Sequence, residues 1–386
     1  MPENRYYFDW AATAVPELLP PETKIPYGNP SSGHREGRDA KEALESCRRR
    51  CAAVLGVPPE TLYFTSGGTE SNCIPLYSYA VRQGSGRILA SAGEHSSVTE
   101  NMKTLERLGK AIGSIPIDSA GCVTPEIVSK TLEKYPDTRF AAIMAVNNET
   151  GTINDIARLR QVLRSGNGHP VHFHCDLVQA AGKIPLDISG WELDSASISA
   201  HKIGGQRGIG LLYLRTPLEA LYAGGGQERN VRPGTENVAG ALAFAACLEN
   251  HATPEKLKSD IGAATRRCNH LLESLSKIKC SQGLHRCRII PAERKVNDAS
   301  FSPYIVQAGF RGIPGEVMVR ALDDIGFAVS TGSACSSASH GRPVLSAMGI
   351  NNSLGLEGIR ISQGWSTTDG EIDLLLGAIA KVLRFL

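Results

Sequence analysis

The sequence predicts an α/β protein: a mostly parallel sheet with helices on both faces, joined to a smaller α+β domain. Strand-like and helix-like segments alternate from residue 62 to residue 175, as in repeated βαβ units. Residues 140–146 are uninterruptedly apolar, as expected of a strand covered on both faces. A length of 386 residues suits two or three domains.

The predicted large domain begins with a helix over residues 39–55, where apolar residues recur at helical spacing and Gly56 ends the run. Another helix opens at Thr124-Pro125-Glu126, with a hydroxyl cap, a proline in the first turn and an early negative charge. The other elements are strands 62–65, 87–91, 140–146, 171–175, 195–199 and 209–214 and helices 69–83, 98–108, 155–164 and 236–250.

Residues 251–254 indicate a boundary. Beyond them we expect helices 255–278, 315–325 and 371–385 and strands 296–301 and 327–330. The prediction is therefore a large domain of residues 13–250 and a small domain of residues 1–12 and 251–386.

Composition argues against several classes of protein. Lysine and arginine number 41 against 39 acidic residues, so nothing favours binding to nucleic acid or to a membrane surface. The longest apolar run, residues 239–248, is too short to span a bilayer, and the first residues lack the apolar core of a secretory signal. Ten cysteines without a Cys-x-x-Cys pair favour a reduced, cytoplasmic setting.

Polar clusters follow five successive predicted strands. Any one of them could be an ordinary turn, but the carboxyl ends of parallel strands share one edge, where ligands bind in open α/β sheets. The clusters are Ser66-Gly67-Gly68-Thr69-Glu70, Glu94-His95, Asn147-Asn148-Glu149, Asp176 with Gln179, and His201-Lys202.

The chemistry of these clusters points to pyridoxal phosphate. Glycines and a threonine at a helix start offer backbone N–H groups and the positive end of the helix dipole to a phosphate. The glycine patterns of nucleotide and dinucleotide sites are missing or misplaced. Lys202, flanked by Ser199 and His201, can form a Schiff base.

The ordered motifs resemble class V aminotransferase-fold enzymes over residues 6–368. The motifs are Tyr7-x-Asp9-x-x-Ala12-Thr13, Gly28-Asn29-Pro30-Ser31-Ser32, residues 65–72, Asn147-Asn148-Glu149-x-Gly151, Asp176-x-x-Gln179, Ser199-x-His201-Lys202 and residues 224–235. Within that class, residues 330–337 and 358–362 are similar to cysteine desulfurases with a long active-site loop. The resemblance implies fold type I.

The resemblance also implies roles for individual residues. Lys202 would carry the cofactor and move a proton, and His95 would stack on the cofactor ring. Asp176 would pair with the pyridine nitrogen and Arg360 would bind the substrate carboxylate. Asn148 and Gln179 would bond the phenolic oxygen and the substrate side, and the phosphate would be held by Gly68, Thr69, Ser199, His201 and, from the second subunit of a homodimer, Thr235.

Cys335 separates the possible reactions. It lies among small residues with no apolar pattern to bury it. Its thiolate would attack the sulfur of L-cysteine, form a persulfide and release L-alanine, and the sulfur would pass to a scaffold or carrier protein, for instance in iron–sulfur cluster biogenesis.

Other interpretations stay open at this point. A selenocysteine lyase, another lyase or an aminotransferase of the same fold would keep Lys202, Asp176 and His95, and a catalytically silent protein on this fold is a further alternative. His172, His174 and Asp176 share one strand face and could bind a metal, although the pattern favours no metal site. Two departures from the family pattern are a short segment over 16–28, which we expect to lack the usual helix, and a short tail after Arg360, which leaves the sulfur acceptor undetermined.

Overall fold

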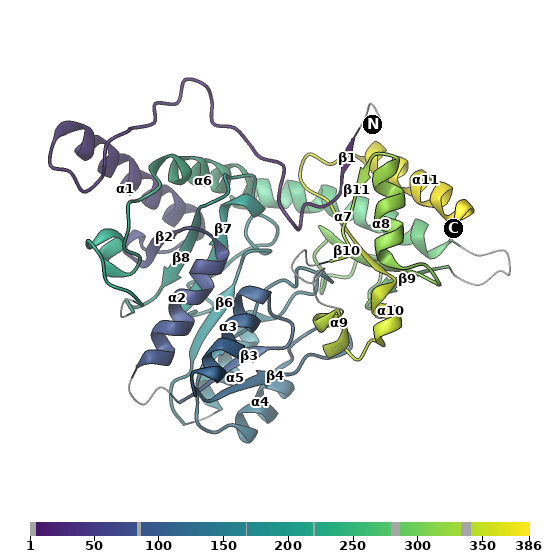
Figure 1. Ribbon diagram of the computed structural model, residues 1–386, viewed down its shortest axis with the longest axis horizontal. Coiled ribbons are helices and arrows are strands. Elements are labelled where there is room, and N and C mark those ends of the chain that lie inside the picture. Colours follow the sequence, from purple (N-terminus) through teal and green to yellow (C-terminus); the bar gives the residue numbers. More distant parts are fainter. Residues whose placement is uncertain (1–4, 83–85, 167, 219–220, 279–285, 333–340) are drawn as a thin grey trace.

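The computed structural model describes residues 5–82, 86–166, 168–218, 221–278, 286–332 and 341–386. Figure 1 shows a large central sheet flanked by helices and, beside it, a smaller sheet with its own helices. Strand β1 and the C-terminal helix α11 both lie with the smaller sheet (Figure 1).

The large sheet has seven strands in the order β2-β8-β7-β6-β5-β3-β4. Strand β8 runs antiparallel to β7 and β2, whereas the pairs among β3 to β7 are parallel, so the predicted mostly parallel sheet is confirmed. The strands are β2 Leu62–Thr65, β3 Arg87–Ser91, β4 Ile112–Ile115, β5 Thr138–Ala142, β6 His172–Asp176, β7 Ser195–Ser199 and β8 Gly210–Leu214.

Helices cover both faces of this sheet. Apolar residues of α2 and α3 pack with β3 and β5 on one face, and those of α1, α4, α5 and α6 build the larger cluster on the other. The Thr124 side chain accepts from the Ile127 N–H and caps α4, as its sequence position predicts. These helices are α1 Arg35–Leu55, α2 Gly68–Val81, α3 Ser96–Arg107, α4 Pro125–Lys134, α5 Ile156–Ser165 and α6 Val238–His251.

The smaller unit is built around an antiparallel sheet in the order β12-β10-β9, with a separate parallel pair β1–β11. Its apolar cluster joins Phe8 to residues between 268 and 383. The elements are β1 Tyr6–Tyr7, α7 Pro254–Ser276, β9 Cys287–Ile290, β10 Ile305–Phe310, α8 Gly315–Asp324, β11 Phe327–Ala328, α9 Pro343–Ala347, α10 Asn352–Leu356, β12 Gly358–Ser362 and α11 Asp369–Phe385.

Three predicted strands differ from the structure. The strand predicted at 327–330 is shorter and ends at Ala328. The segment 296–301 forms turns, because Asn297 has a positive φ of 59° and the Asp298 carboxylate accepts from the Ser300 N–H. Strand β5 ends at Ala142, and residues 143–146 stay buried without continuing as a strand. The apolar run therefore predicted the burial of residues 140–146 correctly, but it predicted a strand that extends too far toward the C-terminus.

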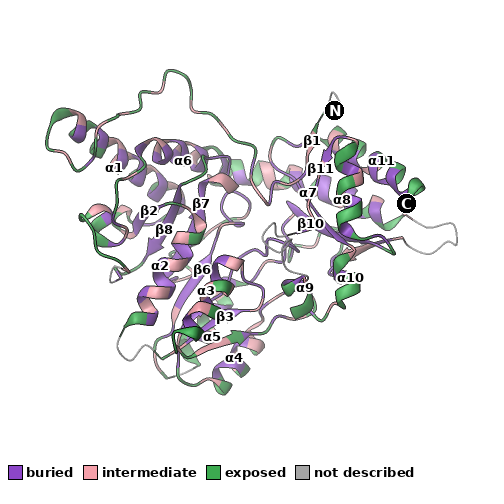
Figure 2. Ribbon diagram, viewed as in Figure 1, coloured by how far each residue is buried: buried purple, intermediate pink, exposed green. Residues whose placement is uncertain are grey.

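The burial pattern in Figure 2 follows this architecture, with buried residues along the central strands and the inner helix faces. Residues 13–34 form an irregular, largely exposed segment without a helix, as expected for its short 16–28 portion. Among the helices of the described residues, none is long and apolar enough to cross a membrane.

Candidate active site

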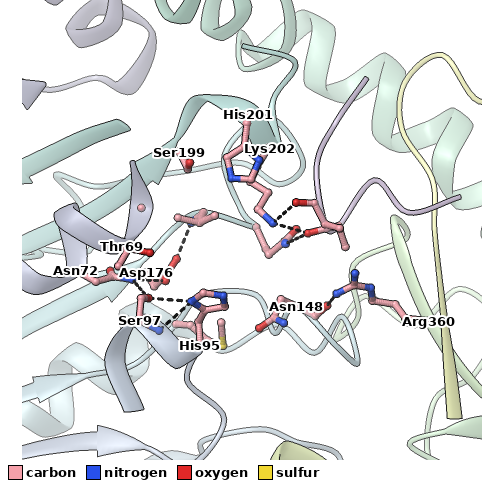
Figure 3. Close-up of a pocket in the computed structure, with 16 residues that line it drawn as sticks. Thr69, Asn72, His95, Ser97, Asn148, Asp176, Ser199, His201, Lys202 and Arg360 are labelled. Atoms are coloured by element: carbon pink, nitrogen blue, oxygen red, sulfur yellow. Dashed lines mark hydrogen bonds between the residues drawn. The ribbon is translucent and has the colours of Figure 1, made fainter. Parts of the chain in front are cut away.

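A cavity of about 250 Å³ opens at the carboxyl edge of the large sheet, opposite β12. Loops after β2, β3, β5, β6 and β7 contribute to it, so the five predicted clusters do converge. Arg360 enters from the opposite side (Figure 3). The predicted residues that line the cavity are Gly68, Thr69, His95, Asn148, Asp176, Gln179, Ser199, His201, Lys202 and Arg360.

The first turn of α2 forms one wall of the cavity. Gly67 precedes the helix with a φ of 152°, a conformation that favours glycine. A Cβ at Gly68 would lie 2.9 Å from Val178 Cγ2, so a side chain there would force the wall apart. The Glu70 carboxylate accepts from the Ser66 N–H and ties the loop back onto the helix. The turn thus presents helix N–H groups to a cavity that also receives Thr69, a suitable place for a phosphate.

Asp176 lies at the base of the cavity at the end of β6, and each oxygen of its carboxylate accepts a hydrogen bond from the protein. One oxygen accepts from Asn72 Nδ2 at 2.7 Å and the other from the Val178 N–H at 2.9 Å. Asn72 Oδ1 in turn contacts His174 Nε2 at 2.9 Å. Burial lowers the pKa of His174 to about 3, so its ring is neutral. These bonds fix an aspartate in a site where 4% of its surface is exposed.

His95 is the N-cap residue of α3 and faces the cavity from below Asp176 (Figure 3). Its Nδ1 accepts from the Ser97 N–H at 3.1 Å, so we assign the proton of the neutral ring to Nε2. Burial lowers the pKa of His95 below its usual range, although the nearby Asp176 charge opposes the shift. At neutral pH the ring can therefore offer an N–H donor to a ligand.

Lys202 lies in a short 3₁₀ turn, Ala200–Lys202, that follows β7. Its Nζ donates to the carbonyl oxygens of Ala11 at 2.6 Å and Ala12 at 2.8 Å. The neighbouring His201 contacts Thr13 Oγ1 through Nδ1, and burial, together with the Lys202 charge, lowers the pKa of His201 to about 4. The N-terminal segment thus closes the cavity over the lysine.

Arg360 occupies the centre of β12 and is 2% exposed. Its Nη1 donates to the Asn148 carbonyl at 2.9 Å and its Nη2 to Asp9 Oδ1 at 2.8 Å. Arg360 Nε and Asn148 Oδ1 are both buried without a hydrogen-bond partner. An unpaired donor and an unpaired acceptor are therefore available to a ligand on this side of the cavity.

Two predicted site residues do not belong to this cavity as described. Thr235 is exposed and does not line it, and Cys335 lies outside the described residues. Asn72, Ser97 and the hydrogen bond from Arg360 to Asp9 were not predicted. Asn72 and Asp9 did occur within the quoted motifs, which were their only signal, because their contacts depend on strand packing.

The metal alternative fits the structure poorly. His172 Nε2 and His174 Nδ1 both contact Ser195 Oγ at 2.8 Å, and the second nitrogen of His174 contacts Asn72. These hydrogen bonds use ring nitrogens that a metal would need. Within the described ranges, no group of three or more His, Cys, Asp or Glu side chains is arranged to hold a metal ion.

Comparison with known proteins gives a consistent family. The model of the class-V aminotransferase family matches residues 6–375. The protein named cysteine desulfurase IscS of Dictyoglomus turgidum is 35% identical over 392 residues, which cover 99% of this chain and 95% of that protein. The cysteine desulfurase of Mus musculus is 32% identical over 355 residues, covering 90% of this chain and 73% of that protein.

Solved structures agree with this relationship. A NifS-like protein superposes with a TM-score of 0.86 at 33% identity and covers 99% of this chain and 100% of that chain. The NifS-like protein of Rickettsia africae gives a TM-score of 0.84 at 26% identity, with the same coverage of both chains.

Proposed function

The chain belongs to the class-V aminotransferase family, and we propose that within it the protein is a pyridoxal-phosphate-dependent cysteine desulfurase. It converts L-cysteine to L-alanine and transfers the sulfur, by way of Cys335, to an acceptor. The observation that carries this proposal is the convergence of Lys202, Asp176, His95 and Arg360, from four separate segments, on one cavity.

The cavity residues fit pyridoxal phosphate. At Gly68 the backbone can approach a phosphate closely, because no side chain intervenes. The buried Asp176 carboxylate suits a protonated pyridine nitrogen. The unpartnered Asn148 Oδ1 can accept a hydrogen bond from a polar group of the ligand. Bound cofactor supplies an electron sink for negative charge at the substrate α-carbon. Gly68, Thr69, Ser199 and His201 would hold the phosphate, with Thr235 of a second subunit, while Gln179 would bond the phenolic oxygen and His95 would stack on the ring.

Lys202 and His95 handle protons in this proposal. Lys202 Nζ would hold the cofactor covalently and, once the substrate amine has displaced it, would move the α-proton of the substrate. His95 carries its proton on the nitrogen that is not bonded to Ser97, and it can donate that proton or hydrogen bond within the cavity.

Arg360 would bind the substrate carboxylate. Its Nε and Nη2 form one edge of the guanidinium, and a carboxylate fits such an edge with two parallel hydrogen bonds. The unpartnered Nε supports this role, because a buried N–H without an acceptor is costly unless a ligand supplies one.

The sulfur step is assigned to Cys335. Its thiolate attacks the substrate sulfur, so that an S–S bond forms as the substrate C–S bond breaks. The electron pair of the broken bond stays with the carbon skeleton, which takes up protons and leaves as alanine. The persulfide sulfur then passes to a protein acceptor, a scaffold or a sulfur carrier.

We also propose an oligomeric state, a compartment and a domain division for this enzyme. The enzyme is a homodimer, because the exposed Thr235 would complete the phosphate site of the other subunit. It works in the cytoplasm, where thiols regenerate the cysteine. The chain divides into a large domain of residues 13–250 and a small domain of residues 1–12 and 251–386, which contributes Arg360 and Cys335.

The decisive experiment compares the wild type with Cys335→Ala, using Cys122→Ala as the matched control. Wild type and control should release alanine from L-cysteine in the presence of a thiol, and Cys335→Ala should lose this activity while still binding the cofactor. Full alanine and sulfide production by Cys335→Ala would favour a plain lyase instead.

Lys202→Ala tests the attachment of the cofactor separately. Borohydride should remove the yellow colour of the wild type and fix the cofactor to Lys202, as seen by peptide mass analysis. The Lys202→Ala variant should show neither result, and covalent labelling at another lysine would contradict the assignment.

A further inference from the structure

Lys183 is a buried lysine to which the proposed function assigns no task. It lies after β6, near the end of a turn stabilised by hydrogen bonds from the N–H groups of Ala180, Ala181 and Lys183 to preceding carbonyls. The side chain is 2% exposed, and within the described part of the chain no carboxylate forms an ion pair with it. A buried ammonium without a counter-ion is costly, so its remaining contact is informative.

That contact is made with Gln179, which precedes Lys183 by four residues and lies on the wall of the active-site cavity. Lys183 Nζ donates to Gln179 Oε1 at 2.9 Å. At its other end, Gln179 Nε2 donates to the carbonyl of Ala11 at 2.8 Å. If the amide were flipped, its NH₂ group would face the ammonium and its oxygen would face the carbonyl. Both neighbours therefore select the same orientation.

This orientation turns the donor end of Gln179 toward the cavity side. The Ala11 carbonyl accepts from both Gln179 Nε2 and Lys202 Nζ, so the amide nitrogen and the reactive lysine share one acceptor. The phenolic oxygen of the cofactor is an acceptor when it is ionised, and it needs a donor from the protein. A correctly oriented amide supplies that donor, whereas a flipped amide would place an oxygen there.

We propose that Lys183 is a positioning residue whose ammonium holds the Gln179 amide with its NH₂ end toward the cofactor's phenolic oxygen. This inference rests on the proposed function, because it requires that the cavity bind pyridoxal phosphate. Lys183 does not line that cavity, and it acts through Gln179.

The burial of Lys183 and the positive charges near it make a lysine at this position costly, which supports a functional role for the side chain. Burial, together with the nearby charges of Lys202 and Arg360, lowers the pKa of Lys183 to about 7. An apolar side chain of similar size would avoid this cost. Strong perturbation of this kind is typical of groups that serve an active site.

A second cavity, of about 480 Å³, allows the proposal to be tested without disturbing the first. It is lined by Lys183 and by Ile184, Trp191, Cys268 and Lys295, and Gln179 does not line it. Changes in the length of the side chain at position 183 can therefore be accommodated away from the cofactor. Lys295 is an exposed lysine of the same cavity, and Lys295→Met is a matched control.

The test is a double-mutant cycle with Lys183→Met and Gln179→Met in the holoenzyme. It measures the dissociation constant of pyridoxal phosphate and the pH midpoint at which the visible absorption band of the enzyme changes. Lys183→Met alone should weaken cofactor binding about fivefold, the effect of one lost hydrogen bond, and raise the pH midpoint. In the Gln179→Met background the same change should no longer weaken cofactor binding, because the amide is already gone, and it should raise the pH midpoint only by the direct effect of the charge lost near Lys202.

Lys183→Arg keeps a cationic donor and should restore the wild-type pH midpoint. If Lys183→Met does not fold, Lys183→Arg is the variant in which cofactor binding and the pH midpoint are measured. Equal effects of Lys183→Met in both backgrounds, or no effect on either quantity, would overturn the inference. A wild type that binds no cofactor and releases no alanine would instead overturn the proposed function, so the two failures are distinguishable.

Discussion

The two sides of the active-site cavity differ in how completely their polar groups are paired. On the sheet side, which we call the floor, Asn72, His174 and Asp176 bond one another and their neighbours. On the side of β12, which we call the rim, Arg360 Nε and Asn148 Oδ1 lack partners. The polar atoms of these three floor side chains all have hydrogen-bond partners in the protein. The rim has one buried donor and one buried acceptor without a partner.

This difference indicates different tasks. A closed network holds its members in one geometry and suits groups that must already be oriented before a ligand arrives. Open donors and acceptors suit recognition of a ligand that comes and goes. Changes in the floor should therefore affect the rate of the chemical step, and changes in the rim should affect substrate affinity.

The largest expected effect follows from Asp176→Asn in the floor. Asparagine keeps the size of the side chain but removes the charge that would favour a protonated pyridine nitrogen. It also turns an NH₂ group toward one of the two donors, Asn72 Nδ2 or the Val178 N–H. We expect kcat for alanine release to fall about 10²- to 10³-fold, the usual loss when one preorganised electrostatic group is removed.

Single-turnover measurements with L-cysteine would test this expectation, with the KM recorded separately. A variant with near-normal kcat and a raised KM would place Asp176 among the recognition groups and would remove the distinction between floor and rim.

The floor was only partly predictable from the sequence. Asp176, His95 and Lys202 could be identified because each follows a strand, and topology brings such positions to one edge. The bonds from Asn72 to His174 and Asp176 could not, because they depend on how α2 packs over β6 at a separation of about 100 residues.

The same reasoning explains the errors in the fold. Strand β4 has only one fully buried residue of four and gave no strong pattern. In the segment 296–301, which we predicted to be a strand, Asn297 and Asp298 favour a turn. Local sequence patterns thus predicted most strands of the large sheet. The hydrogen bonds between side chains could be identified only from the folded structure.

A second effect concerns stability and again belongs to the floor. The pKa of His174 is about 3 in the fold because the ring is buried, against about 6.5 when unfolded. Below pH ~6.5 the unfolded chain therefore binds a proton that the native ring does not. The stabilisation is complete above that pH and falls by about 1.4 kcal/mol per pH unit as the pH drops toward 3.

Urea unfolding of the wild type and of His174→Gln between pH 5 and pH 8 would measure this effect. The variant should lose less stability on acidification, by about 2 kcal/mol between pH 6.5 and pH 5. Parallel pH profiles for the two proteins would show that His174 is not the neutral, buried partner that closes the network of the floor.

The smallest effect is expected in the rim, at Asp9. This carboxylate accepts from Arg360 Nη2 at 2.8 Å and is 23% exposed as a side chain, so it is a partly solvated competitor for the guanidinium. Asp9→Asn removes the competing charge, while the Asn148 carbonyl still holds Arg360 through Nη1. We expect the KM for L-cysteine to fall about two- to fivefold with kcat little changed, since such pairs contribute up to about 1 kcal/mol.

Asp323→Asn is the matched control for this experiment, because it breaks an exposed ion pair with Arg5 elsewhere on the N-terminal segment. It should leave both constants unchanged. If Asp9→Asn instead raised the KM, Asp9 would be a support that orients Arg360, and the rim would resemble the floor in being built before the substrate binds. The direction of one change in KM thus decides whether the two sides of the cavity follow different principles.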